Sequence, residues 1–123
     1  MYSTYDRFKW SALRDAAHID NGSAVYADVK RGYPQGTDEE NDQLVQKALL
    51  ELLDDGLIFF YWSDWDNGVM LDAQTAPRAS RAEIEAELAR GGSAPAKEET
   101  VWFAATETGR DVLDGLPRKA FLD

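Results

Sequence analysis

The sequence predicts a single α+β domain, residues 1–123, in which helices come first and strands follow. Two patterns lead to this class. Apolar residues recur at helical spacing through residues 37–55, whereas residues 57–62 form a continuous β-branched and aromatic run. The length of 123 residues and the 44% hydrophobic content suit one globular core.

Three N-terminal helices are expected. Thr4 can cap the first, which extends to about residue 18, and Ser23 can cap the second, which extends to about residue 30. Gly and Pro residues predict a loop over residues 31–36.

The third helix has the clearest signals. Thr37 and Glu40 form a capping box, and an apolar stripe follows as far as Leu53. Gly56 supplies the left-handed residue that ends the helix. The first strand, residues 57–62, follows directly.

A long insertion, residues 63–99, separates the two main strands of the small antiparallel sheet. Its Asp-Asn-Gly sequence at 66–68 predicts a tight turn, after which residues 69–71 can return as a short strand. Ser80 and Glu83 form a second capping box, which predicts a helix to about residue 89.

The second main strand is expected at residues 100–105. Thr106 then caps a C-terminal helix that ends near Pro117. The apolar residues expected to face the core from this helix are Val112, Leu113 and Leu116.

Two passages resemble the winged helix-turn-helix family. Residues 49–58, LLELLDDGLI, are similar to a third helix that ends at glycine and leads into the first wing strand. Residues 102–113, WFAATETGRDVL, are similar to the strand, threonine, glycine and closing helix that follow the wing. The resemblance extends over about residues 5–116 and implies a winged-helix fold with residues 63–99 as an enlarged wing that contains a helix. It also implies DNA binding, in which the third helix of a bacterial regulator enters the major groove.

The charge distribution does not suit DNA binding. The net charge is −10, and residues 37–123 contain nineteen Asp or Glu against eight Lys or Arg. The attraction between basic side chains and phosphates dominates DNA binding, and carboxylates beside the phosphates turn it into repulsion. We therefore expect a non-catalytic acidic module, an adaptor or inhibitor that binds a basic protein in the manner of immunity proteins, anti-repressors or DNA mimics. The acidic candidates for this contact are Asp38, Glu39, Asp42, Glu51, Asp54 and Asp55.

The aromatic strand adds to this hypothesis, because both of its faces are apolar. One face has Ile58, Phe60 and Trp62, and the other has Leu57, Phe59 and Tyr61. Either the helix at 80–89 covers the second face, or the aromatic side chains are exposed and anchor a partner. In the second case the anchors are Phe59, Tyr61 and Trp65.

The alternative is a winged-helix DNA-binding transcriptional regulator that uses another surface. Its candidate contacts are the basic residues of the first two helices, Arg7, Lys9, Arg14, Lys30 and Arg31. Weak homodimerisation is compatible with either function.

Patterns for other chemistry are missing. The sequence has no cysteine, one histidine (His18), and neither a GxxxxGK[ST] nor a GxGxxG motif. The Asp-rich stretch from Asp64 resembles a calcium loop, but Thr75 stands where the bidentate glutamate should be. We expect no catalytic residue, no metal and no cofactor. We also expect no membrane span, and a cytoplasmic location.

Overall fold

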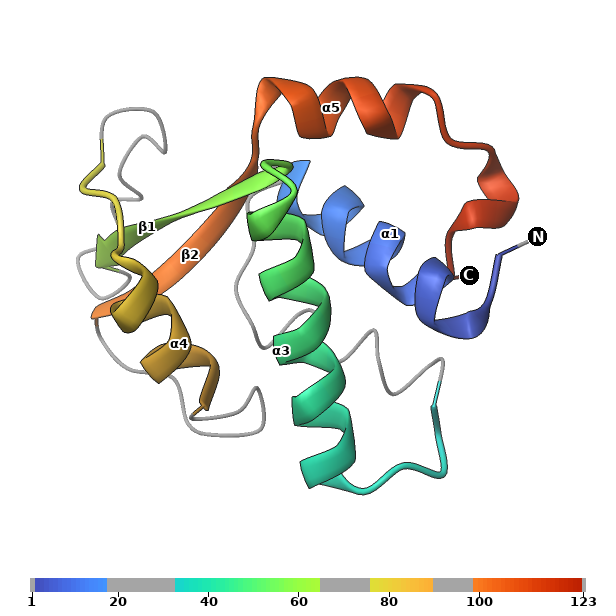
Figure 1. The fold of residues 1–123 in the computed structure, drawn as a ribbon, viewed down its shortest axis with the longest axis horizontal. Helices are drawn as coiled ribbons and strands as arrows, with labels where there is room; N and C mark the ends of the chain where they lie inside the picture. The colour runs from blue at the N-terminus through green and yellow to red at the C-terminus, as the bar shows by residue number, and fades with distance from the viewer. Residues whose placement is uncertain (1, 18–32, 65–75, 90–98, 123) are drawn as a thin grey trace.

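A computed structural model describes residues 2–17, 33–64, 76–89 and 99–122. Across these residues the chain forms four α-helices, one 3-10 helix and a two-stranded antiparallel sheet, so the expected α+β class is confirmed (Figure 1). The helix expected at 23–30 and the turn and short strand expected at 66–71 lie outside the described residues.

Helix α1, Thr4–Ala17, buries one face. Phe8, Ala12 and Leu13 have no exposed surface. Its cap is Ser3 rather than the expected Thr4. The Asp6 N–H donates to Oγ of Ser3 at 3.0 Å, and the Ser3 N–H donates to Oδ2 of Asp6 at 3.2 Å. In a capping box, the capping residue lies three positions before the residue with which it exchanges hydrogen bonds. The exchange with Asp6 therefore makes Ser3 the cap and Thr4 the first residue of the helix.

Helix α3, Asp38–Asp54, begins at the predicted capping box. The Glu40 N–H donates to Oγ1 of Thr37 and the Thr37 N–H donates to Oε1 of Glu40, both at 3.1 Å. The buried residues of the helix are Asn41, Val45, Ala48, Leu49 and Leu52. After the helix, Gly56 has a φ of 73°, a conformation in which other residues are strained.

The sheet pairs β1, Ile58–Asp64, with β2, Glu99–Ala105. The register runs from Ile58 opposite Ala105 to Asp64 opposite Glu99. Along the other edge of β1, the Trp62 N–H donates to the Pro77 carbonyl at 2.9 Å, and the Ala79 N–H donates to the Phe60 carbonyl at 3.1 Å. Residues 77–79 therefore protect this edge of the sheet.

The inner face of the sheet carries the main core. Ile58 and Phe60 of β1 pack there with Val101 and Phe103 of β2 against α1 and α3. Helix α4, Arg81–Ala89, begins at the predicted Ser80–Glu83 capping box. The apolar residues that α4 adds to the same inner core are Ile84 and Leu88.

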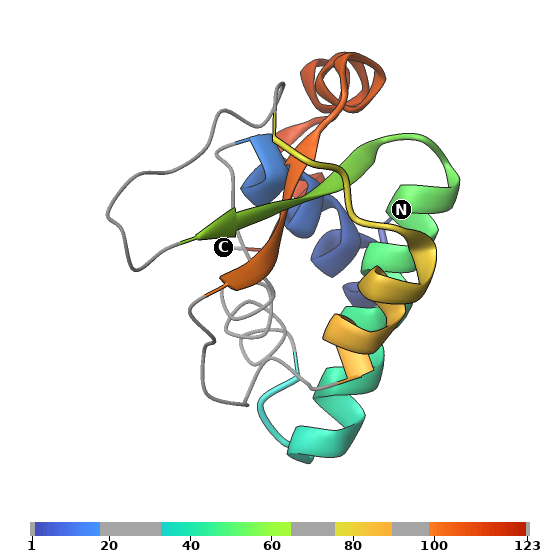
Figure 2. The ribbon, with the colours of Figure 1, turned by 90° about the vertical axis from the view of Figure 1, so that its left-hand side faces the viewer.

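Of the two alternatives for the aromatic strand, the one in which the helix at 80–89 covers the second face of the strand is therefore wrong. Helix α4 packs against α3 and β2 on the inner side (Figure 2). The outer face has a smaller cluster of its own, in which Tyr61, Trp102, Ala76 and Ala104 are buried and Phe59 is half-buried. Residues 77–79 follow the edge of β1 and lead the chain toward α3, which is why α4 reaches the inner core.

Helix α5, Glu107–Asp114, begins at the predicted cap. The Gly109 N–H donates to Oγ1 of Thr106 at 3.0 Å, and this hydroxyl donates to the Gly56 carbonyl at 2.7 Å. The residues expected to be buried, Val112, Leu113 and Leu116, are only half-buried. The chain then forms the 3-10 helix Arg118–Ala120, which brings Ala120 and Leu122 into contact with α1.

Gly109→Ala should destabilise the protein. A Cβ at this position would lie 2.1 Å from the Leu57 carbonyl oxygen, and this is backbone that cannot rotate away. The expected loss is roughly 1–3 kcal/mol of unfolding free energy, measured by urea denaturation. Gly115→Ala is the control, because its Cβ would meet the nearest atom at 3.6 Å, an ordinary contact. Equal midpoints for the two variants would contradict the close approach.

The capping glutamate of α3 should make stability depend on pH. Hydrogen bonds from the backbone N–H and from the side chain of Thr37 lower the pKa of Glu40. Ionised Glu40 therefore stabilises the fold above pH 4.5, and this contribution is lost as the pH falls through the lowered folded-state pKa. Glu40→Gln keeps an acceptor oxygen but does not titrate. The difference in Tm between wild type and Glu40→Gln should shrink below pH 4.5.

Glu39→Gln is the matched control for this measurement, since Glu39 is exposed in the same turn but lies outside the capping box. Its difference from wild type should change less with pH. The explanation fails if both variants follow the same pH dependence.

Candidate functional site

The acidic surface is formed by α3 and α4, which pack side by side (Figures 1 and 2). Arg81, the first residue of α4, hydrogen-bonds to Asp54, the last residue of α3. The Nε of Arg81 also lies 3.0 Å from Oε1 of Glu85. All three side chains are about half-exposed, so solvent screens these pairs and their main effect is to orient the groups.

The charge of this surface is strongly one-sided. Helix α3 carries six acidic side chains and one basic side chain, Lys47, whereas α4 carries three acidic side chains and one basic side chain, Arg81. Because Arg81 already bridges two carboxylates, the net field outside the two helices is negative.

The acidic residues predicted from the sequence fall into two groups on α3. Asp38, Glu39 and Asp42 lie near its beginning, and Asp54 and Asp55 lie at its end. Twelve residues from Asp42 to Asp54 correspond to about 18 Å along the helix axis. Asp38, Glu39, Asp54 and Asp55 are exposed, and Asp42 is half-buried. At about 100° per residue, Asp54 and Asp55 are also turned to other sides of the helix than Asp38, so the acidic candidates form two groups at opposite ends rather than one compact patch.

Glu51, another predicted contact residue, takes part in the packing of α1 on α3. Its Oε2 accepts a hydrogen bond from the Tyr5 hydroxyl at 2.8 Å and lies 3.6 Å from Nζ of Lys9. Nζ of Lys47 lies 4.4 Å from the centre of the Tyr5 ring. Burial and the bond to Glu51 raise the pKa of Tyr5. Glu51 is thus engaged within the fold before any partner binds.

The predicted aromatic anchors are not brought together on an open surface. The proposal of Tyr61 as a partner contact needs correction, because Tyr61 has no exposed surface. Its neighbours Ala76, Trp102 and Ala104 bury it on the outer face. Phe59 is half-buried, and Trp65 lies outside the described residues.

The basic residues of the alternative DNA-binding hypothesis are engaged in internal contacts where the structure describes them. Arg7 Nε donates to the Phe121 carbonyl at 3.1 Å. Arg14 donates to the Leu122 carbonyl at 3.5 Å, and its guanidinium lies 4.9 Å from the Phe121 ring. Lys9 is on a different face of α1 and pairs with Glu51. Lys30 and Arg31 lie outside the described residues.

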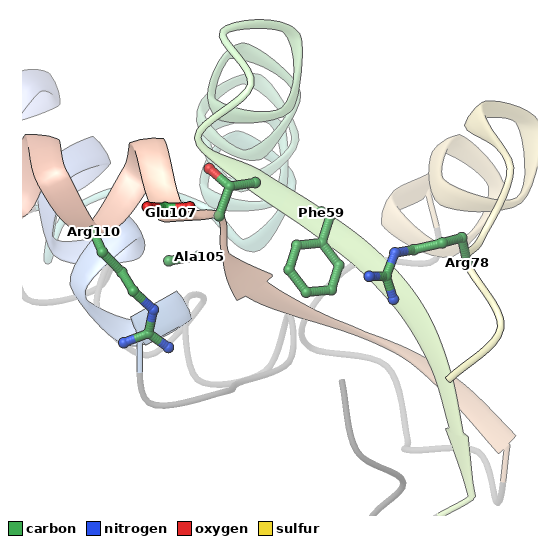
Figure 3. Close-up of a pocket in the computed structure, with 6 residues that line it drawn as sticks. Phe59, Arg78, Ala105, Glu107 and Arg110 are labelled. Atoms are coloured by element: carbon green, nitrogen blue, oxygen red, sulfur yellow. The ribbon is translucent and has the colours of Figure 1, made fainter. Parts of the chain in front are cut away.

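A pocket of about 550 Å³ lies on the outer face of the sheet, open to solvent, beside the first turn of α5 (Figure 3). Its lining residues are Phe59, Arg78, Ala105, Thr106, Glu107 and Arg110. The Arg78 guanidinium lies 4.1 Å from the centre of the Phe59 ring. One N–H of Arg110 donates to the Ala17 carbonyl at 3.4 Å.

The comparisons with known proteins give no relative. No family model, no curated protein and no solved structure matches the chain significantly. Among the described residues, no helix is long and apolar enough to cross a membrane. The same part of the chain contains no group of three or more side chains arranged as metal ligands. His18 and most of the stretch that resembles a calcium loop are outside it.

Sequence reasoning missed the two arginines that line the pocket. Arg78 and Arg110 are separated by more than thirty residues, and no local pattern connects them. For Arg110 the available signal was its place one residue after Gly109, in the first turn of a helix whose cap was correctly predicted. The role of Arg81 in joining α4 to α3 was also missed. Its available signal was the spacing of four residues to Glu85, which is typical of an ion pair on a helix.

Two tyrosines should respond in opposite ways when their hydroxyl groups are removed. Tyr5→Phe removes the hydrogen bond to Glu51 and should lower the unfolding free energy by about 1 kcal/mol. Tyr61→Phe should leave stability unchanged or raise it by up to about 1 kcal/mol, because the buried Tyr61 hydroxyl has no acceptor among the described residues. The same burial raises the pKa of Tyr61 to about 12.

Urea denaturation of both variants beside wild type measures these effects. Tyr2→Phe controls for loss of a hydroxyl that makes no hydrogen bond within the described part of the chain. A loss of stability in Tyr61→Phe as large as that in Tyr5→Phe would contradict the difference between the two sites.

Proposed function

We propose that the protein is a non-catalytic protein-binding module, an adaptor or inhibitor that binds a basic partner through the exposed surface of α3 and α4. The proposed mode of action is that of an immunity protein or DNA mimic. Negative charge spread along two helices attracts cationic partners over a distance comparable with the Debye length, about 8–10 Å at physiological salt. The proposal includes a winged-helix arrangement of α1, α3, β1, β2 and α5, which the order of these elements supports.

The observation that carries the proposal is the packing of α4 against α3. Without α4, the acidic residues of α3 would form two separate groups at its ends. With α4 alongside, exposed Glu83 and Glu85 extend the negative surface sideways. A surface two helices wide is the shape that a basic groove or patch on another protein requires, because charge complementarity over an area gives specificity and a fast association rate.

The same packing argues against the alternative, a DNA-binding regulator that reads the major groove with α3. One side of α3 is occupied by α4, which brings three more carboxylates near the place where phosphates would lie. Neutralising phosphates requires available Lys and Arg side chains. Arg7, Lys9 and Arg14 instead make contacts inside the fold.

Binding to two oppositely charged probes tests this proposal. Fluorescence anisotropy at low salt should show no binding to a labelled random-sequence DNA duplex. A labelled peptide rich in Arg and Lys should bind, and its affinity should fall as salt is added. Binding of the duplex that weakens steeply with salt would reverse the assignment in favour of the DNA-binding regulator.

Charge-neutralising variants locate the surface. Glu39→Gln with Asp55→Asn removes one exposed charge from each end of α3 and should weaken peptide binding at least threefold. Asp111→Asn with Asp114→Asn removes the same charge from the exposed side of α5 and should have a smaller effect. Equal effects of the two double variants would mean that net charge alone, and not the α3–α4 surface, attracts the peptide.

A further inference from the structure

The outer-face pocket borders the end of α3, where the Thr106 hydroxyl donates to the Gly56 carbonyl, but its chemistry differs from that of the acidic surface. Its walls come from β1, the end of β2, the first turn of α5 and the segment at Arg78, so it is formed by elements that meet only in the folded chain. A volume of about 550 Å³ is within the range of pockets that hold small organic molecules.

The charge of the pocket is opposite to that of the protein as a whole. Among the described residues, two guanidinium groups, on Arg78 and Arg110, line it together with one carboxylate, on Glu107. In a chain with a net charge of −10, a pocket with an excess of positive charge is a local exception. It therefore favours an anionic ligand over a cationic one.

Arg110 is the group best placed to hold an anion. A guanidinium has five N–H donors, and the interaction that Arg110 makes within the described residues is a single long bond of 3.4 Å to the Ala17 carbonyl. It stands in the first turn of α5, where the helix dipole also favours negative charge. Its planar fork matches the two oxygens of a carboxylate.

Phe59 supplies an apolar wall beside this charge. The ring is half-buried between the outer cluster and the pocket, and Arg78 approaches it from the segment before α4 (Figure 3). The stacked Arg78 keeps positive charge next to the ring. An inorganic ion would leave this apolar wall in contact with water, whereas a ligand with a flat apolar part would cover it.

We propose that this pocket binds a small organic anion in which a carboxylate is joined to a flat apolar group. The carboxylate lies against Arg110, and the apolar part lies against Phe59. Glu107, which also lines the pocket, disfavours ligands that bear more than one negative charge, because its carboxylate repels a second one.

Titration with benzoate, followed by the backbone amide signals in two-dimensional ¹⁵N NMR spectra, tests the proposal. Benzoate at millimolar concentration should shift the amide signals of Phe59, Gly109 and Arg110. Benzamide has the same ring without the charge, and acetate has the charge without the ring. Each should bind at least tenfold more weakly than benzoate.

Arg110→Gln should weaken benzoate binding at least tenfold. Arg118→Gln is the matched control, because Arg118 is exposed on the 3-10 helix, outside the pocket lining. Thermal unfolding curves of Arg110→Gln and Arg118→Gln show whether both variants still fold. Phe59→Leu keeps an apolar side chain but removes the ring, and it should weaken benzoate binding independently of Arg110. The proposal is overturned if benzoate shifts none of these signals, if benzamide binds equally well, or if Arg110→Gln and Arg118→Gln bind benzoate alike.

Discussion

The arrangement of the described helices and strands depends on one junction, where the end of α3 meets the beginning of α5. The Leu57 N–H donates to the Leu52 carbonyl at 2.9 Å, and the Thr106 N–H donates to the Leu57 carbonyl at 3.0 Å. The Thr106 hydroxyl closes the junction on the Gly56 carbonyl at 2.7 Å. Because Gly109 has no side chain, α5 can lie directly on this backbone. These contacts set the register between β1 and β2, because the first strand pair, Ile58 and Ala105, lies next to Leu57 and Thr106.

That register divides the molecule into two faces with different roles. The inner face carries the core shared with α1, α3 and α4. The outer face carries a small cluster around Tyr61 and the pocket beside Phe59. Since α4 packs on the inner side, it widens the acidic surface of α3 and does not line the outer pocket. The proposed anion pocket therefore contains no residue of α3 or α4, the two helices of the proposed protein-binding surface.

The fold also uses part of the positive charge of the chain. Arg7 and Arg14 donate to the carbonyls of Phe121 and Leu122, and Ser11 accepts from the Leu122 N–H at 2.8 Å. These bonds join α1 to the end of the described chain, more than one hundred residues later. Because these two bonds are part-buried, Arg7 and Arg14 are less available to an external anion than Arg110, whose bond to the Ala17 carbonyl is exposed. The acidic residues therefore dominate the electrostatic field around α1 and α3.

The sequence by itself determined the features whose interactions are local. The caps at Thr37, Ser80 and Thr106 and the left-handed Gly56 were predicted because each depends on residues within three or four positions. The negative charge of α3 follows in the same way from the residues of one continuous segment. Only the tertiary structure decided which face α4 covers, that Tyr61 is buried, and that Arg78 and Arg110 line one pocket. These features arise from contacts between residues far apart in sequence, which no local periodicity records.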